Sequence, residues 1–230
     1  MSKPQQSRFS GAPWFNIAQD AHVVIGGAGG IGSWLSLFLA RIGITIHVYD
    51  MDRFEEHNMG GQFVQESNMG INKADAIQDN LDAFCPGGLV NTYGEYDNTS
   101  LSHKYMMAGF DIMKPRKIMF ERWLEFGSFY GNKDVVPIFI DGRLLMEQIQ
   151  IFCVTRKTAD DYKKNHLFDD EEVDDEVCSL KQTSHSAAMI AGFMTSFFTN
   201  HLANISNGNS SRAVPYKFEY FIPLNLFTDG

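Results

Sequence analysis

Apolar and polar positions follow two different periods in the first half of the chain, and these periods predict strands and helices in turn. Short apolar runs, each the length of one buried strand, alternate with longer segments whose apolar residues recur at spacings of three and four. The predicted strands are residues 23–25, 44–49, 89–93, 105–110 and 135–140, with one more inside 143–154. The predicted helices are residues 14–20, 31–42, 73–84, 115–126 and 187–202.

The order of these elements predicts the class of fold. Strands alternate with helices as far as about residue 140, and the strands then gather, with one or two more predicted in residues 216–227. Alternation of this kind is typical of an α/β protein, and a run of strands adds antiparallel neighbours. We therefore expect a Rossmann-like, doubly wound, mostly parallel sheet with an antiparallel C-terminal extension. The length of 230 residues favours a single domain over residues 1–230.

Two stretches stand outside this pattern. Residues 1–13 are mostly polar and contain two prolines, so we expect an N-terminal arm. Residues 160–177 show the one strong change of composition, because seven of the eight positions from 169 to 176 are Asp or Glu. A charge run of this density is typical of a solvated segment, so we predict an acidic crossover loop at residues 160–177.

The glycines of residues 26–32 carry the first chemical signal. Five of these seven positions are glycine, and they lie between an apolar strand and an apolar helix. In a dinucleotide-binding unit, Gly27 allows a tight turn, Gly29 a close approach to a phosphate, and Gly32 close packing of the helix on the strand. Free N–H groups at the start of such a helix face an anion. The predicted cofactor-binding residues of this turn are Gly27, Gly29, Gly30 and Gly32.

An acidic residue completes the nucleotide-binding pattern. Asp50 ends the second predicted strand and follows Gly27 by 23 residues, near the spacing at which a carboxylate accepts hydrogen bonds from a ribose. A glycine turn alone is a weak signal, and two flanking strands and a following acid make it stronger; the alternative is a tight turn in a doubly wound fold that binds nothing. We therefore predict that the chain binds a nucleotide.

The overall charge narrows the choice of partners. The formal net charge is −9 at pH 7, with 44% hydrophobic and 20% charged residues. A nucleic-acid-binding protein normally presents a basic surface, and an anionic membrane repels an acidic protein. No apolar run reaches the roughly 18 residues that a membrane span needs. We therefore expect an ordinary soluble globular protein with neither a nucleic-acid nor a membrane partner.

The cysteines indicate the compartment. There are three, widely spaced, and the first residues lack the apolar core of a signal peptide, which together favour a reducing, cytoplasmic location. No CxxC pair is present, so we expect no structural zinc site. Cys85 and Cys153 lie in apolar surroundings and are predicted to belong to the core.

A wider set of residues resembles the ThiF/MoeB/HesA family, which is related to the ubiquitin-activating enzymes. The family's motifs occur here in order: the turn Gly27-Ala28-Gly29-Gly30-Ile31-Gly32, then Asp50 and Asp52, then Asn58 with Gln62, and then Lys73. Asp111 and Arg116 resemble its strand-end Asp followed by Arg, and residues 143–152 resemble its later strand. The resemblance covers roughly residues 8–203.

This resemblance implies a chemistry. Such proteins are usually homodimers that bind ATP and magnesium. They adenylate the C-terminus of a small ubiquitin-like protein, a sulfur-carrier protein or a peptide, and release pyrophosphate. Both reactants are anions, so a lysine and a magnesium ion would neutralise their charge. We therefore expect an adenylyltransferase.

The resemblance also implies roles for single residues. Lys73 matches the phosphate-binding lysine, and Asp111 matches the magnesium ligand at the carboxyl end of a strand. Asp50 would hold the ribose, and Asp52 would help to order the site. The remaining polar residues of the implied site are Asn58 and Gln62, at the phosphates or the ribose, and Arg8, which would reach into the site of the other subunit.

Several of these residues also have a purely structural reading. Lys73 fits a solvated residue at the start of a helix, and Asp111 fits a helix N-cap. Asp52 fits a carboxylate that starts a loop, and Arg8 fits a residue on a disordered arm.

Two positions depart from the family pattern. Gly61 stands before Gln62 where the family has a phosphate-binding arginine, whose charged hydrogen bond contributes on the order of 1.5–3 kcal/mol. Ile112 stands where the family has an amide. These departures leave open a catalytically silent ThiF-like dimer that acts as a binding module. A third hypothesis, an NAD-dependent oxidoreductase, rests on the glycine turn and Asp50 alone.

Cys178 has two interpretations. It precedes the last predicted helix, where many family members carry a cysteine, and its thiolate could accept the activated acyl group. A thiolate forms beside positive charge, and Lys181 is near in sequence, but residues 174–176 are all acidic. The alternative is a small buried hydrophobe at the start of the helix.

Overall fold

An eight-stranded sheet organises the molecule. The computed structural model describes residues 8–129, 136–145, 147–169 and 183–229, without the side chains of residues 127–129. The order of the strands across the sheet is β3-β2-β1-β4-β5-β6-β7-β8. The strands are β1 (His22–Gly26), β2 (Thr45–Tyr49), β3 (Val90–Tyr93), β4 (Tyr105–Ala108), β5 (Ile138–Leu145), β6 (Gln148–Val154), β7 (Lys217–Phe221) and β8 (Leu226–Asp229).

The pairing of the strands confirms the predicted fold class. From β3 to β5 every neighbouring pair is parallel, and from β5 to β8 every pair is antiparallel. Strands β1, β2, β4 and the first half of β5 have buried apolar side chains on both faces, as in other sheets that are covered on both sides. The structure is a Rossmann-like sheet with an antiparallel C-terminal extension.

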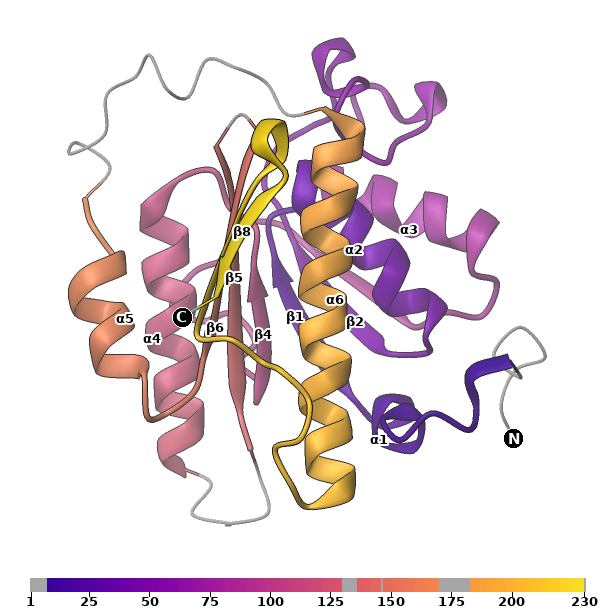
Figure 1. Cartoon of the computed structure of the whole chain (residues 1–230). Coiled ribbons are helices and arrows are strands. Elements are labelled where there is room, and N and C mark those ends of the chain that lie inside the picture. Colours follow the sequence, from indigo (N-terminus) through magenta and orange to yellow (C-terminus); the bar gives the residue numbers. More distant parts are fainter. Residues whose placement is uncertain (1–7, 130–135, 146, 170–182, 230) are drawn as a thin grey trace.

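Helices cover both faces of the sheet and form a three-layer molecule (Figure 1). One face carries α1 (Phe15–Gln19), α2 (Gly30–Arg41), α3 (Lys73–Phe84) and α6 (Ser184–Asn207). The other face carries α4 (Met113–Phe129) and α5 (Ala159–His166). Because successive side chains of a strand alternate between the faces, Val24 packs toward α4 while Ile25 packs toward α2. Within the described part of the chain, no helix combines the length and the apolar character needed to cross a membrane.

Helix α3 agrees with its predicted bounds because its start has a strong local signal. The side chain of Asn72 accepts hydrogen bonds from the backbone N–H groups of Ala74, at 2.9 Å, and Asp75, at 3.4 Å. These bonds satisfy two of the orphan donors at the helix N-terminus. Apolar residues of one face, Ile77 and Leu81, are then buried against the sheet.

The predicted break between the fifth and sixth strands is misplaced. We expected a strand to end at residue 140, but β5 continues through Gly142 to Leu145. A Cβ atom on Gly142 would lie 2.5 Å from Sδ of Met194, so this glycine lets α6 cross close to the sheet rather than ending the strand. Cys153 in β6 is buried, and burial raises the pKa of its thiol above the ordinary value. Cys85 is buried too, so the predicted core positions of both cysteines are confirmed.

The predicted acidic loop at residues 160–177 is wrong in its first part, because residues 159–166 form helix α5. Its charges suit a helix: Asp160 and Asp161 lie in the first turn, and Lys163, Lys164 and His166 lie in the last. Tyr162 is fully buried on the inner face, a contact that composition alone does not reveal. Residues 170–177 lie outside the described residues.

Helix α6 and the N-terminal arm have more regular structure than predicted. Helix α6 is longer than predicted and ends at Gly208, which has a left-handed φ of 62°. Residues 8–13 form turns, and the ring of Phe9 lies 5.6 Å from that of Trp14. The predicted arm therefore packs on α1 in the part that the structure describes.

Candidate functional site

The glycine turn lies where the order of the strands reverses, between β1 and β4. Gly109, just after β4, donates its N–H to the carbonyl of Gly26 at 2.8 Å. Gly27 has a left-handed φ of 89°, and a Cβ atom there would lie 3.0 Å from the carbonyl oxygen of Gly109. Ligands of doubly wound folds bind in the crevice at such a switch point. Both loops lie at the upper end of the sheet in Figure 1.

The glycines differ in what surrounds them. A Cβ atom on Gly32 would lie 1.8 Å from the carbonyl oxygen of Gly27, so only glycine fits there. A Cβ atom on Gly29 would meet nothing within 4 Å, and Gly29 precedes α2 without any side-chain cap bond. The tight turn at Gly27 and the close packing at Gly32 are confirmed. The open space before α2 fits an anion, and contact of Gly29 with a phosphate stays a prediction.

Asp50 is held in place below this space. Its Oδ2 accepts the N–H of Ala28 at 2.7 Å, and its Oδ1 accepts the N–H of Asp52 at 2.8 Å. Burial raises the pKa of Asp50, and these two hydrogen bonds oppose that rise. Each carboxylate oxygen keeps a second lone pair, so the group can still accept hydrogen bonds from a ligand hydroxyl.

Lys73 and Asp52 form an ion pair beside Asp50. The distance from Nζ of Lys73 to Oδ2 of Asp52 is 3.0 Å, and the lysine side chain is 12% exposed against 55% for the aspartate. The backbone repeats the contact, since Lys73 N–H donates to the Asp52 carbonyl at 2.8 Å. Nδ2 of Asn72 donates to the Asp50 carbonyl at 2.9 Å. The structure therefore brings Asp50, Asp52 and Lys73 together at the end of β2.

The loop of residues 58–62 is fixed by neutral groups. Oδ1 of Asn58 accepts the N–H of Glu55 at 3.0 Å and so caps its own 3-10 turn. The carbonyl of Gly60 accepts both the N–H of Ser184, at 3.0 Å, and its hydroxyl, at 2.7 Å. Indole Nε1 of Trp34 donates to the Gly61 carbonyl at 3.3 Å. The start of α6 and α2 thus hold the loop in which the arginine is missing.

Gln62 has a buried atom that the protein leaves unpaired. Its Oε1 has no hydrogen-bond partner among the residues that the structure describes. A buried oxygen of this kind costs free energy unless a donor reaches it. Its position in the loop next to the glycine turn fits a ligand that donates a hydrogen bond.

Asp111 follows β4 and is exposed. Its loop packs on the glycine turn, because a Cβ atom on Gly26 would overlap the ring of Phe110 at 2.3 Å. In the described part of the chain, no group of three or more His, Cys, Asp or Glu side chains could hold a metal ion. Magnesium is commonly held by one or two carboxylates together with phosphate oxygens and water. Asp111 fits that mode of binding.

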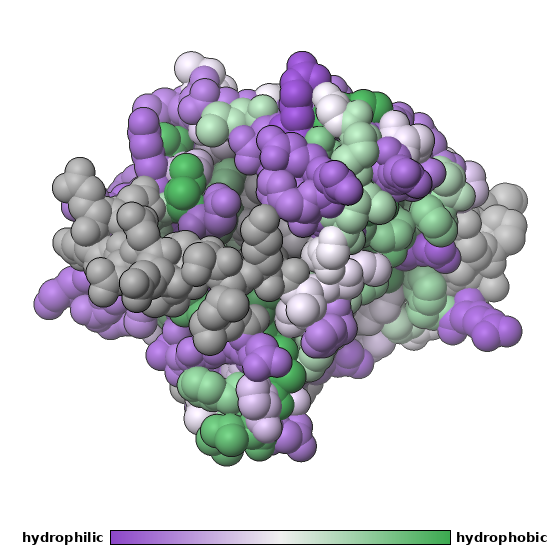
Figure 2. Space-filling view, turned by 90° about the horizontal axis from the view of Figure 1, so that it is seen from above, coloured by the Kyte–Doolittle hydropathy of each residue, from purple (hydrophilic) through white to green (hydrophobic). Residues whose placement is uncertain are grey.

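Two predicted residues are not brought to this site in the described chain. Arg8 is exposed, and its segment lies near α1, away from the glycine turn (Figure 1). Cys178 lies outside the described residues. Figure 2 looks onto the end of the molecule that carries the site, and the described surface there is mostly polar with scattered apolar side chains. Exposed apolar residues of the site loops are Met51, Met59 and Ile112.

Sequence reasoning missed a buried charge network beside the site. Asp141 is fully buried in β5, with Arg116 and Arg143 bound to its two oxygens. The sequence prediction includes Arg116 only as part of a motif and does not pair Asp141 with Arg143. The available signal was two opposite charges around Gly142 within an otherwise apolar run, which a buried strand tolerates only if the charges are paired.

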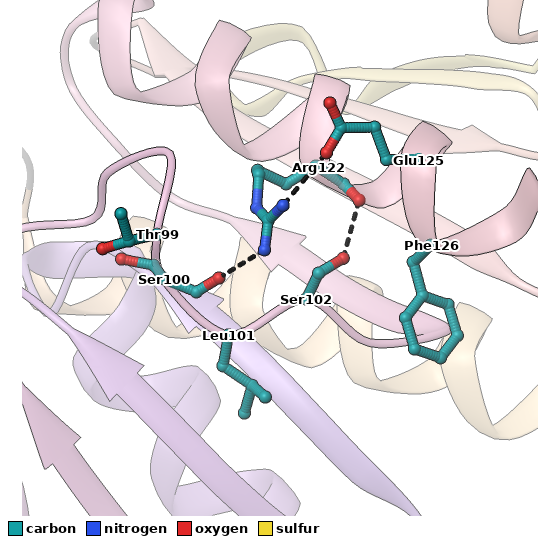
Figure 3. Close-up of a pocket in the computed structure, with 7 residues that line it drawn as sticks. All are labelled: Thr99, Ser100, Leu101, Ser102, Arg122, Glu125 and Phe126. Carbon is teal, nitrogen blue, oxygen red and sulfur yellow. Dashed lines mark hydrogen bonds and ion pairs between the residues drawn. The ribbon is translucent and has the colours of Figure 1, made fainter. Parts of the chain in front are cut away.

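A separate cavity of about 380 Å³ lies away from these residues (Figure 3). It is lined by Thr99 to Ser102 and by Arg122, Glu125 and Phe126 of α4, and by none of the predicted site residues. Arg122 donates from Nη1 to Oε2 of Glu125 at 3.0 Å and from Nη2 to the Ser100 carbonyl at 2.9 Å. These pairings tie α4 to the loop before β4 at the wall of the cavity.

Comparisons with known proteins find a family match over the part of the chain that contains these residues. The model of the ThiF family matches residues 7–113, which include the glycine turn, Asp50, Lys73 and Asp111. The tRNA threonylcarbamoyladenosine dehydratase of Escherichia coli (strain K12) is 29% identical over 145 residues, which cover 59% of this chain and 51% of the relative. The chain thus spans about half the length of that curated relative.

Solved structures with the same fold cover nearly the whole chain. Escherichia coli MccB with ATP matches with a TM-score of 0.69 and 16% identity, over 100% of this chain and 71% of MccB. MccB in complex with N-formylated MccA matches with a TM-score of 0.70 and 17% identity, over 98% and 71%. PaaA matches with a TM-score of 0.67 and 18% identity, over 98% and 68%. At these identities the likeness shows the fold alone.

The family match and the fold thus agree. The resemblance to the ThiF family that the motifs predicted is borne out by the family model, which matches residues 7–113.

Proposed function

We propose that the chain is an ATP-dependent adenylyltransferase that acts on the C-terminal carboxylate of a peptide or a small carrier protein. The observation that carries the proposal is the open space at Gly29 beside Asp50, which accepts the Ala28 N–H and the N–H of Asp52, the partner of Lys73, at the switch point of the sheet. The match of residues 7–113 to the ThiF family supports it, as do the structures of MccB with ATP and with the peptide MccA.

The residues would share the work as follows. The N–H groups at the start of α2 face the phosphates, and Asp50 accepts the ribose hydroxyls. A carboxylate oxygen of the substrate attacks the α-phosphorus, the bond to the β-phosphate oxygen breaks, and pyrophosphate leaves. Lys73 offsets the negative charge that both reactants bring. Its ammonium group must first leave Asp52, which is the more exposed partner of the pair.

Magnesium and a second subunit complete the proposal. Asp111 would hold the ion, which would polarise the phosphates. Arg8 would act in the site of the other subunit of a homodimer. Passage of the product to Cys178 and a cytoplasmic location both stay predictions.

A catalytically silent binding module is the second candidate. Gly61 leaves no charge where the family has an arginine, and Ile112, which is 45% exposed, leaves no amide beside Asp111. Such a protein would bind ATP without turning it over on any carboxylate. Exposed Arg53 is a cation that could replace the missing one, although its Nη1 is engaged with the Gly70 carbonyl at 2.7 Å.

Exchange of labelled pyrophosphate into ATP tests the proposal. Peptide pools with free C-termini are the probe, and the same pools with C-terminal amides are the control. We expect exchange with the free carboxylates only, falling by about 100-fold or more in Lys73→Ala. Lys157→Ala, at an exposed lysine outside the site, should leave exchange unchanged. ATP binding without exchange on any free carboxylate, including small proteins that end in Gly-Gly, would favour the silent module.

A further inference from the structure

Asp141 is the centre of a buried charge network next to the site. Its carboxylate is completely buried, and three side chains donate to it. Nε of Arg116 lies 2.7 Å from Oδ1, Nε of Arg143 lies 2.7 Å from Oδ2, and the Tyr162 hydroxyl lies 2.8 Å from Oδ2. These side chains come from β5, α4 and α5, so one carboxylate joins three elements.

Each arginine uses a second group to hold a backbone carbonyl. Nη2 of Arg116 donates to the carbonyl of Phe110, the residue before Asp111. Nη2 of Arg143 donates to the carbonyl of His166, at the end of α5, at 2.7 Å. The network therefore fixes the loop after β4 and the point at which the chain leaves α5.

The network lies level with the glycine turn. In the parallel pairing of β4 with β5, Asp141 is opposite Ala108, and Ala108 is opposite Gly26 in β1. Asp141 is fully buried and reaches no ligand itself, so any effect on the site must pass through its arginines.

Stability alone does not explain this arrangement. Burial raises the pKa of Asp141, but Arg116 and Arg143 outweigh it and bring the pKa below the ordinary value, so the group is ionised at neutral pH. Buried ion pairs are often no more stabilising than apolar side chains of similar volume, because the charges lose their hydration. The charged groups fix the relative positions of the groups they join, because a guanidinium can bind a carboxylate and a carbonyl at once in fixed geometry.

We propose that Asp141 is a positioning residue for the adenylation site. Through Arg116 it holds the Phe110 carbonyl and so sets the place of Asp111, and through Arg143 it holds the end of α5. This inference rests on the proposed function for its effect on magnesium and ATP. The positioning itself is a property of the fold and can be tested without any ligand.

The test replaces the charges by apolar side chains of similar size. The triple variant Arg116→Met, Asp141→Leu and Arg143→Met leaves no unpaired buried charge, so the fold should be retained. The first measurement is the NMR order parameter of the amides of residues 110–112. We expect it to fall from about 0.85 in the wild type to below about 0.6 in the variant, while α3 stays rigid. The second is the magnesium concentration needed for half-maximal ATP binding, which we expect to rise about tenfold or more.

Arg122→Met is the matched control. Arg122 lies on the same helix and also holds a loop carbonyl, that of Ser100, but away from the site. Its replacement should change neither the order of residues 110–112 nor the magnesium requirement. A folded triple variant with unchanged order at residues 110–112 overturns the proposal.

Two further outcomes keep the test decisive. If the triple variant does not fold, Tyr162→Phe removes one hydrogen bond to Asp141 and one accepted from Arg143, and leaves both arginines on the carboxylate. It should shift both readouts in the same direction by a smaller amount. An unchanged order parameter in that variant overturns the proposal. If the wild type binds no ATP, the proposed function fails, and the order parameters still decide the positioning role.

Discussion

At the scale of single residues, Gly29 and Gly32 have opposite surroundings. Gly32 has a backbone carbonyl in the space of its missing side chain, whereas Gly29 faces open space. Gly32→Ala should lower the free energy of unfolding by about 2 kcal/mol or more, because the helix must move away from the turn. Gly29→Ala should change it by less than about 0.5 kcal/mol, yet weaken ATP binding about tenfold. Chemical denaturation and calorimetry on both variants separate these effects, and equal losses in both assays would contradict the assignment.

His103 makes stability depend on pH. Burial lowers its pKa from 6.5 to about 4, helped by His22, Lys104 and His47 nearby. The unfolded state therefore binds more protons than the folded state between these two pKa values. The contribution to stability is fully present above about pH 6.5 and is lost as the pH falls toward 4.

The variant His103→Gln should flatten this part of the profile. Its loss of stability between pH 7 and pH 4.5 should be smaller than that of the wild type by roughly 1–2 kcal/mol, a figure reduced because solvent screens the exposed part of the ring. Thermal unfolding at both pH values measures it. Identical pH profiles for the variant and the wild type would show that His103 is not protonated on unfolding in this range.

The residues that the sequence could predict are those whose spacing is local. Asp50 and Lys73 follow the glycine turn at motif distances, and the structure places them together. Asp141 is 25 residues from Arg116, and their contact depends on how β5 lies beside β4. No local period contains that information, so the sequence could indicate that Asp141 and Arg143 are paired but not that Arg116 joins them.

At the scale of elements, Asn72 links the site to the start of α3. Its Oδ1 caps the helix while its Nδ2 donates to the Asp50 carbonyl. Asn72→Ala should cost about 1–2 kcal/mol in the free energy of unfolding, because both interactions are lost. Asn72→Ser keeps the cap and loses only the second, so it should cost less. Urea denaturation compares the two variants. An unchanged free energy of unfolding in Asn72→Ala would mean that the cap contributes nothing.

The strength of the local sequence signal explains which elements were predicted well. Helix α3 has both a cap and an apolar period, and its predicted bounds are confirmed. Helix α5 has only Ala159 and Tyr162 buried, so its eight residues look like a solvated charge run. Strand β5 runs through a glycine, which in the sequence alone signals a break. In both failures tertiary contacts, of Tyr162 and of Met194, decide the local structure.

At the scale of the whole molecule, the order of the strands brings distant segments together at the carboxyl end of the parallel strands. The turn after β1, the end of β2, the loop after β4 and the start of α6 meet there. The alternation of strands and helices predicted the class of fold. The contacts between these segments were not predicted, because they depend on the order of the strands across the sheet.

A homodimer in which Arg8 completes the other subunit's site predicts complementation. Arg8→Ala and Asp111→Ala, each inactive alone, should regain activity when mixed and allowed to exchange subunits. One site of each mixed dimer is then intact, so activity should reach about a quarter of the wild-type value. Pyrophosphate exchange measures it. Activity that does not return, although mixed dimers form, would show that Arg8 does not act in the other subunit's site.

Calorimetric titration with ATP and magnesium, run beside NAD on the wild type and on Asp111→Ala, tests the central claim most directly. The account predicts that the wild type binds ATP with magnesium and does not bind NAD. In Asp111→Ala the magnesium-dependent part of the affinity should be lost, while the fold, followed by thermal unfolding, stays intact. Binding of NAD without ATP, or ATP binding that is equally tight in Asp111→Ala, would contradict it.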